Sequence, residues 1–298
     1  MSSFKEKFAE YIRFTEDNLR KYNAPADGET AQKDLISAMN YSLEAGGKRI
    51  RPTLVYAFCE ACGGDFRKAA APAAAIEMIH TFSLIHDDLP AMDNDEYRRG
   101  KKTTHVVYGE AMAILAGDAL LNLAYETASK AFELEPANPA VGRAFGILAA
   151  KTGIYGMIGG QSVDVEYEGK PLTEEQLCFI YRLKTSALIE ASMMIGAVLA
   201  GACDEDVEKI EQIARKVGMA FQIQDDILDV IGDADTLGKA TKSDEKNNKT
   251  TYVSVKGLEQ AQKDVAEYSK EAVTLLEELP YENEFLKELI LNLIHRNA

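Results

Sequence analysis

Residues 69–95, AAAPAAAIEMIHTFSLIHDDLPAMDND, join a long apolar run to a cluster of aspartates. The first 17 residues of this stretch are rich in alanine, and Ile76, Ile79 and Phe82 recur at the spacing of one helix face. Such a run predicts a buried helix, and the aspartates that follow predict that carboxylates stand at its C-terminal end.

The same helical period recurs through most of the chain, in residues 4–22, 110–134, 174–202, 207–230 and 261–279. Only residues 250–255 look strand-like, and the one candidate hairpin turn, Asp27-Gly28, has no alternating pattern on either side. We find neither a repeat nor a linker that would divide the chain. The sequence therefore predicts an all-α helical bundle that forms a single domain over residues 1–298.

The composition is that of a folded globular protein, with 46% hydrophobic and 27% charged residues. The formal net charge of −15 argues against nucleic acid and against an anionic membrane surface as partners. No apolar stretch approaches the ~20 residues of a membrane-spanning helix, and the N-terminus lacks the apolar core of a secretory signal. Cys59 and Cys62 resemble half of a zinc or redox motif, but without a second pair we interpret them as packed residues of a reduced, cytoplasmic protein.

The first aspartate cluster contains Asp87 and Asp88 at the end of the predicted helix and Asp93 slightly further on. Pro90 lies between them and should interrupt the helix, because proline removes a backbone donor and clashes with the preceding turn. We expect the chain to turn back after Pro90, so that Asp93 approaches Asp87.

The second aspartate cluster lies far away in the sequence, in FQIQDDILDV at residues 221–230. Asp225 and Asp229 are four residues apart and share one helix face, where two negative charges repel. Apolar neighbours should partly bury that face, which is costly unless a cation compensates the charges. Carboxylate oxygens suit Mg²⁺, and the sequence offers no histidine or cysteine set for a softer metal.

Other interpretations of the acidic segments are weaker. Solvated helix ends would explain one Asp-Asp pair, but two matching clusters on apolar helices are harder to explain in this way. Residues 233–244 resemble an EF-hand loop only poorly, because Leu237 and Asp244 occupy positions that normally carry other residues. His86-Asp87 resembles the metal-binding dipeptide of HD-type phosphohydrolases, whose further histidines are missing here.

Basic residues gather at two places in this acidic chain, in GGKRIRP at residues 46–52 and in RRGKK at residues 98–102. Arginine and lysine bind phosphate oxygens, so cations beside carboxylates suit a diphosphate that is held both through Mg²⁺ and directly. A salt-bridged surface loop is the alternative for either cluster alone. Residues 232–248, with Lys239, Lys242 and Lys246, form a polar loop that could close over such a site.

Together these segments resemble the trans-prenyltransferase (isoprenyl diphosphate synthase) family, and most closely its bacterial farnesyl diphosphate synthases. The matching motifs follow the family's order over residues 40–255: GGKRIRP at 46–52, HDDLPAMDND at 86–95, RRGK at 98–101, GGQ at 159–161, KT at 184–185, residues 221–230 and TLGK at 236–239. The resemblance implies an all-α fold around a deep central cavity, with both aspartate motifs at its mouth, and a homodimer. A terpene cyclase would differ at Asp225-Asp226, and a non-catalytic subunit tends to lose one aspartate motif.

The resemblance also implies a role for individual residues. Mg²⁺ and the allylic diphosphate would be bound by Asp87, Asp93 and Asp225, supported by Asp88, Asp226 and Asp229. Further ligands of the allylic diphosphate would be Arg98, Lys184 and Lys239. Isopentenyl diphosphate would be bound by Lys48, Arg51, His80 and Arg99. Thr185 and Gln222 would place oxygen dipoles beside the developing carbocation, so that the catalytic set is Lys184, Thr185 and Gln222.

The length of the product can be argued from Phe82, which lies five residues before Asp87 and hence a little over one helical turn deeper. A ring at this position should form a floor for the growing chain, so we expect farnesyl rather than geranylgeranyl diphosphate as the product. The alternative is that Phe82 only packs in the core. Lys242, Ser186 and Val253 depart from the family's usual residues and bear on loop dynamics more than on the reaction.

Overall fold

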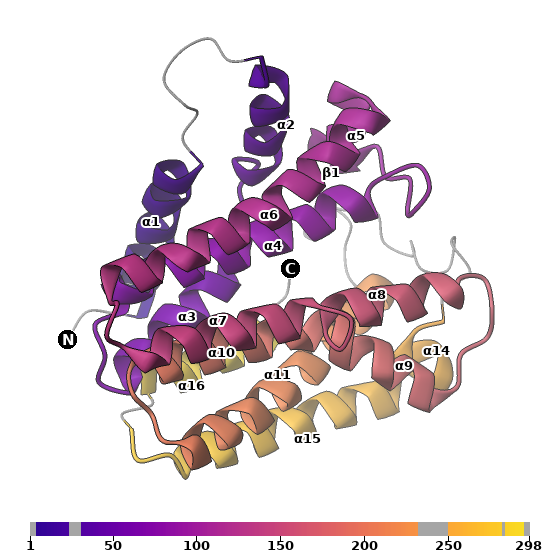
Figure 1. The fold of residues 1–298 in the computed structure, drawn as a ribbon. Coiled ribbons are helices and arrows are strands. Elements are labelled where there is room, and N and C mark those ends of the chain that lie inside the picture. Colours follow the sequence, from indigo (N-terminus) through magenta and orange to yellow (C-terminus); the bar gives the residue numbers. More distant parts are fainter. Residues whose placement is uncertain (1–3, 24–30, 232–249, 282–283, 295–298) are drawn as a thin grey trace. The chain divides into compact units, whose positions relative to one another are not determined.

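The computed structural model describes residues 4–23, 31–231, 250–281 and 284–294 (Figure 1). It is 79% helical, and the described residues contain a single two-stranded sheet, so the all-α prediction is confirmed. The chain forms two compact units, one of residues 1–56 and 66–145 and the other of residues 57–65 and 146–298. That the whole chain is one domain stays a prediction.

Among the described residues, the first unit contains five helices, a 3₁₀ turn and a small hairpin, together with parts of two helices that it shares with the second unit. In chain order they are α1 (Phe4–Tyr22), α2 (Lys33–Leu43), the first part of α3 (Ile50–Ala61), η1 (Phe66–Ala69), α4 (Ala70–Asp87), β1 (Tyr97–Arg98), β2 (Lys101–Lys102), α5 (Thr104–Tyr108), α6 (Glu110–Leu134) and the first part of α7 (Pro139–Thr152).

The core of the first unit is the long contact between α4 and α6, which run side by side in Figure 1. Most of α4 is buried, as its apolar sequence predicts. At position 117 of α6 any Cβ would lie 2.1 Å from Nε2 of His86, so glycine is needed there for the imidazole to fit. His86 also contacts the ring of Phe82 edge-on, with 5.7 Å between the ring centroids. These contacts fix the end of α4 where the first aspartates stand.

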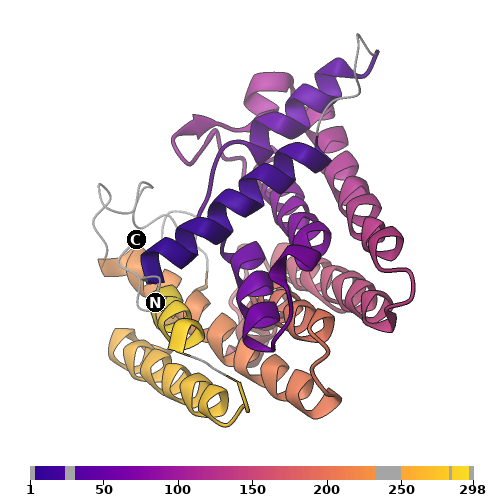
Figure 2. The ribbon, with the colours of Figure 1, turned by 90° about the vertical axis from the view of Figure 1, so that its left-hand side faces the viewer.

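The second unit contains the remaining helices. After α7 they are α8 (Met157–Glu166), α9 (Glu174–Ile180), the π-helix η2 (Tyr181–Ser186), α10 (Ala187–Leu199), α11 (Asp204–Ile231), α14 (Tyr252–Lys256), α15 (Leu258–Glu277) and α16 (Glu284–Ile294). The core forms around α10, which is almost entirely buried, and around the contact of α11 with α15. Figures 1 and 2 show α15, in yellow, beside α11, in orange.

Two local predictions were wrong. Residues 250–255 are not a strand: Thr251 and Ser254 form reciprocal side-chain-to-backbone hydrogen bonds, and this capping box starts helix α14 despite the β-branched residues. The strands β1 and β2 were missed, because the turn between them, Arg99-Gly100, has no alternating pattern around it. Both turn residues have positive φ, 54° and 74°, as a tight hairpin requires. The candidate turn at Asp27-Gly28 lies outside the described residues.

None of the helices in the described part of the chain combines the length and the apolar character needed to cross a membrane. Cys59 is buried in α3, and Cys62, just beyond the end of α3, is a free and partly buried thiol. This agrees with the interpretation of the pair as packed residues.

Candidate active site

The first aspartate cluster folds back on itself as predicted. Helix α4 ends at Asp87, and after Pro90 the backbone N–H of Asp93 donates to the carbonyl oxygen of Asp87 at 2.9 Å. The carbonyl of Leu89 accepts from the N–H of Asn94 at 3.1 Å, which closes the same turn. Asp93 is exposed and Asp87 is partly exposed, so this turn holds both residues at the surface end of the helix.

Asp88 differs from its neighbours because it is buried and paired with Arg98. Its Oδ1 accepts from Nε of Arg98 at 2.7 Å and lies 2.6 Å from Nη2, and Arg98 also lies 3.5 Å from Asp95. Burial raises the pKa of Asp88, and Arg98 acts in the opposite direction. The ion pair fixes the guanidinium of Arg98 directly beside the first aspartate cluster.

Several arginines lie near His80, on the same helix α4. Burial lowers the pKa of His80 well below its usual value, and the charges of Arg51, Arg99, Arg98 and Arg49 lower it further. Burial also lowers the pKa of Arg51 to about 10, opposed by Glu77 and reinforced by Arg99. Within the described part of the chain, the buried Nε of Arg51 has no hydrogen-bond acceptor. The first unit therefore has a strongly positive region with a buried donor suited to an anion.

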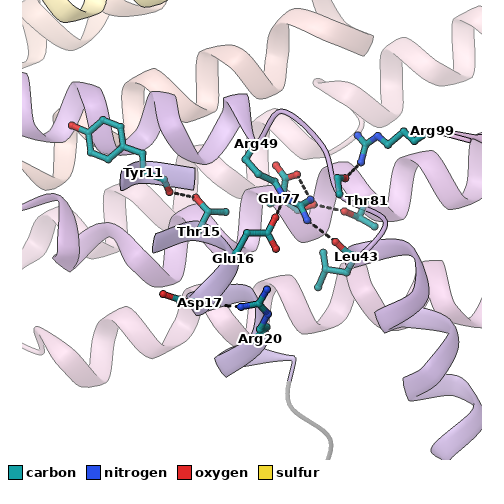
Figure 3. Close-up of polar contacts among 11 residues, drawn as sticks. Tyr11, Thr15, Glu16, Asp17, Arg20, Leu43, Arg49, Glu77, Thr81 and Arg99 are labelled. Atoms are coloured by element: carbon teal, nitrogen blue, oxygen red, sulfur yellow. Dashed lines mark hydrogen bonds and ion pairs between the residues drawn. The ribbon is translucent and has the colours of Figure 1, made fainter. Parts of the chain in front are cut away.

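The loop of residues 46–49, which carries Lys48 and leads into Arg51 of α3, is fixed by Arg49, which Figure 3 shows at the centre of a polar network. Its guanidinium donates to Glu16 at 2.7 Å, to Glu77 at 2.8 Å and to the carbonyl of Leu43 at 2.7 Å. Three helices, α1, α2 and α4, are thus joined to one side chain that is only 2% exposed. Arg99 donates to the carbonyl of Gly46 in the same loop.

In the second unit, Lys184 and Thr185 lie on the π-helix η2. Nζ of Lys184 is 2.7 Å from Oδ2 of Asp164 on α8, which places the ammonium group beside a carboxylate. A Cβ at position 160 of α8 would lie 2.2 Å from the backbone nitrogen of Lys184, so Gly160 lets the two helices touch. This close approach is the structural reason for the second glycine of the GGQ motif. Ser186 is buried and donates to the carbonyl of Tyr181 at 3.2 Å, within the π-helical turn.

The second aspartate cluster lies on α11, where Asp226 and Asp229 are buried and Asp225 is partly exposed. Oδ2 of Asp226 accepts from the hydroxyl of Tyr181 and from the backbone N–H of Tyr252, the latter at 2.7 Å. One turn earlier, Gln222 accepts a hydrogen bond from Thr185 at 2.8 Å. The structure thus brings together two of the three residues in the predicted catalytic set.

The predicted residues fall into sets that each lie within one unit. In the first unit the structure joins Asp87 with Asp93 and Asp88 with Arg98, and it places Arg51 and Arg99 close enough for their charges to lower the pKa of His80. Lys48 is exposed on the loop of residues 46–49, and Phe82 is buried one turn before His86. In the second unit it joins Thr185 with Gln222 and places Asp225 and Lys184 on α11 and η2. Lys239 and Lys242, with the loop of residues 232–248, lie outside the described residues, as does the whole EF-hand-like segment of residues 233–244.

Three polar residues at these sites were not predicted: Glu77, Asp164 and Tyr181. Glu77 could have been found, because a lone carboxylate inside the alanine-rich run of residues 69–85 must have a buried partner. Tyr181 is 45 residues from Asp226 in sequence, so no spacing indicates their contact. Among the described residues, no three His, Cys, Asp or Glu side chains already stand together as a metal site.

Comparison with known proteins gives the class. Residues 32–287 match the model of the polyprenyl synthetase family. The chain is 41% identical over 298 residues to the farnesyl diphosphate synthase of Escherichia coli, covering 99% of both chains. It is 48% identical over 247 residues to the geranylgeranyl diphosphate synthase of Cyanophora paradoxa, covering 83% of this chain and 81% of that protein.

A solved structure agrees with these relatives. The geranyltransferase of Helicobacter pylori, complexed with magnesium and isoprenyl diphosphate, superposes with a TM-score of 0.83 at 34% identity, covering 99% of this chain and 97% of that one. The chain therefore belongs to the polyprenyl synthetase family. Within it, the chain is a trans-prenyl diphosphate synthase, an enzyme that transfers prenyl groups.

Proposed function

We propose that the protein condenses isopentenyl diphosphate with dimethylallyl or geranyl diphosphate, with Mg²⁺, to give (2E,6E)-farnesyl diphosphate. One observation carries this proposal: helix α4 bears a carboxylate turn at its end and a cation-surrounded residue, His80, seven residues earlier. Two helical turns span about 10 Å. One helix can therefore serve a metal-bound diphosphate at its end and a directly bound diphosphate about two turns earlier.

The carboxylates fit Mg²⁺ by their chemistry. Asp87 and Asp93 are held close by the backbone turn after Pro90, and both offer hard oxygen ligands. We assign Mg²⁺ to these two residues and, on the family resemblance alone, to Asp225. Bound Mg²⁺ withdraws charge from the allylic diphosphate and so favours the ionisation of its C–O bond.

The cations around His80 suit the second diphosphate. Arg51 offers a buried donor, Arg99 lies at the loop of residues 46–49, and Lys48 is exposed on the same loop. An anion bound here offsets the mutual repulsion of these charges. We therefore assign isopentenyl diphosphate to Lys48, Arg51, His80 and Arg99, and the allylic diphosphate to Arg98 and Lys184, with Lys239 as a third ligand.

Product length is the finer part of the proposal, because the relatives include both farnesyl and geranylgeranyl diphosphate synthases. Phe82 is 6% exposed and stands edge-on to His86, one turn from the end of α4. A ring held in this way is a rigid obstacle. We expect Phe82→Ala to lengthen the product beyond C15, as measured by chromatography. An unchanged C15 product would mean that Phe82 only packs in the core. If the unmodified protein makes geranylgeranyl diphosphate, the alternative function of a geranylgeranyl diphosphate synthase is favoured.

The decisive experiment incubates the purified protein with Mg²⁺, isopentenyl diphosphate and each allylic diphosphate in turn, followed by identification of the products. Elongation to C15 supports the proposal, and no elongation with any starter contradicts it. Asp87→Ala and Asp225→Ala should both abolish elongation; if only the first did, the two aspartate motifs would not share one substrate. A homodimer and a cytoplasmic location are further parts of the proposal, and light scattering tests the first.

A further inference from the structure

Two pairs of polar residues form a ladder of hydrogen bonds between η2 and α11, within the second unit. Tyr181 and Thr185 are four residues apart on η2, and Gln222 and Asp226 are four residues apart on α11. The hydroxyl of Tyr181 donates to Oδ2 of Asp226, and the hydroxyl of Thr185 donates to Oε1 of Gln222 at 2.8 Å. Along α11, Nε2 of Gln222 points to Oδ1 of Asp226 at 3.4 Å.

The charge of Asp226 determines which groups donate and which accept along this ladder. A carboxylate only accepts hydrogen bonds, so the side of the Gln222 amide that faces it must be the NH₂ group. The amide oxygen of Gln222 then faces Thr185, and it can only accept. The hydroxyl hydrogen of Thr185 is therefore directed at Gln222, and the lone pairs of Thr185 are left for other contacts.

The surroundings of Asp226 fit this role better than direct metal binding. Asp226 is only 4% exposed, and its Oδ2 already accepts from Tyr181 and from the backbone N–H of Tyr252. A carboxylate oxygen with two donors on it is satisfied without a cation. Its neighbour Asp225 is partly exposed and is the better metal ligand of the two.

We propose that Asp226 and Tyr181 are positioning residues that orient the hydrogen bonds of Gln222 and Thr185, so that the Thr185 oxygen presents its lone pairs to a cationic allyl group. This inference rests on the proposed function, in which Thr185 lies beside the developing carbocation. An oxygen dipole stabilises positive charge only if its hydrogen points away. The ladder fixes this orientation before the substrate binds, so no reorientation is needed during the reaction.

The test uses the full-length protein, four single variants and one double variant, with kcat and the half-saturating Mg²⁺ concentration as separate measurements. Tyr181→Phe and Asp226→Asn remove the donor and the charge that orient the ladder, and each should lower kcat about tenfold or more. Half-saturating Mg²⁺ should stay within about twofold of the unmodified protein. Tyr252→Phe is the matched control, because its hydroxyl donates to Asp264 while its backbone N–H still reaches Asp226.

Thr185→Val distinguishes a positioning role of Tyr181 from a purely structural one. It removes the oxygen that the ladder orients, so Tyr181→Phe should lower kcat little further in the Thr185→Val background. Independent, multiplying losses would overturn the inference, and so would a raised Mg²⁺ requirement in Asp226→Asn together with normal kcat in Tyr181→Phe. Failure of the unmodified protein to elongate any allylic diphosphate would instead refute the proposed function.

Discussion

Of the single substitutions possible in the polar network of Figure 3, Arg49→Met should lower the stability of the first unit the most. Arg49 is 2% exposed and donates three hydrogen bonds, two of them to carboxylates. Burial alone lowers the pKa of Arg49, but Glu77 and Glu16 more than offset this effect and raise it overall. The guanidinium is thus held in its charged form by its partners.

The loss of stability in Arg49→Met comes mainly from the buried carboxylate that loses its partner. Glu77 is only 2% exposed, and loss of Arg49 leaves its carboxylate buried without this partner. Breaking a buried ion pair from one side costs about 3–5 kcal/mol. At about 2–4 °C per kcal/mol for a domain of this size, Tm should fall by roughly 6–20 °C.

Thermal and chemical unfolding, followed by circular dichroism, measure this loss. Arg20→Met is the control: Arg20 pairs with the exposed Asp17 at 3.5 Å on the same α1, so its loss should cost about 0–1 kcal/mol. The double variant Arg49→Met/Glu77→Gln should be more stable than Arg49→Met, because it leaves no unpaired charge at position 77. Equal small losses for Arg49→Met and Arg20→Met, or a double variant less stable than Arg49→Met, would refute the reasoning.

Three further predictions concern His80, Lys151 and Gly160. The pKa of His80 lies below its usual 6.5, so the unfolded chain takes up the proton at a higher pH than the folded one. The free energy of unfolding should therefore fall as the pH drops below about 6.5. Urea titrations of His80→Asn should show a smaller dependence on pH. Lys151 lies 2.6 Å from Glu211 and also contacts the buried Glu190, so Lys151→Met should lower the free energy of unfolding by about 3 kcal/mol at neutral pH. Burial raises the pKa of Glu190, so the difference in stability between the variant and the unmodified protein should narrow in acid. A difference that does not change with pH would contradict this account. Gly160→Ala forces a methyl group against the backbone of Lys184 and should lower Tm and kcat together, whereas a variant with normal kcat would show that η2 tolerates displacement.

The sequence predicted the helices well where the apolar period was long and uninterrupted. Helix α6 has the predicted bounds, 110–134, and α4 ends at Asp87, where the proline two residues after the aspartate pair indicated an end. The return of Asp93 to Asp87 was also predictable, because it depends only on local backbone chemistry. These features share one property: all the residues that decide them lie within a few positions of each other.

What the sequence could not predict depends on contacts between distant residues or on reciprocal caps. The π-helical turn of η2 lies inside an unbroken apolar period, which continues through residues 174–202 and hides it. The ladder between η2 and α11 joins residues about 40 positions apart, and only the fold brings them together. The capping box at Thr251 overrode the strand preference of residues 250–255, because two hydrogen bonds at a helix start outweigh a weak β propensity.

The hairpin of β1 and β2 holds two neighbouring arginines in different environments. Arg98 contacts Asp88 and Asp95, while Arg99 contacts the loop at Gly46. If each arginine binds one of the two diphosphates, a shift of this short hairpin when Arg98 binds its diphosphate would also move Arg99. Thermodynamic reciprocity then requires each substrate to change the affinity of its partner substrate by the same factor. On this assignment, the hairpin would make the affinity for one diphosphate depend on whether the other is bound.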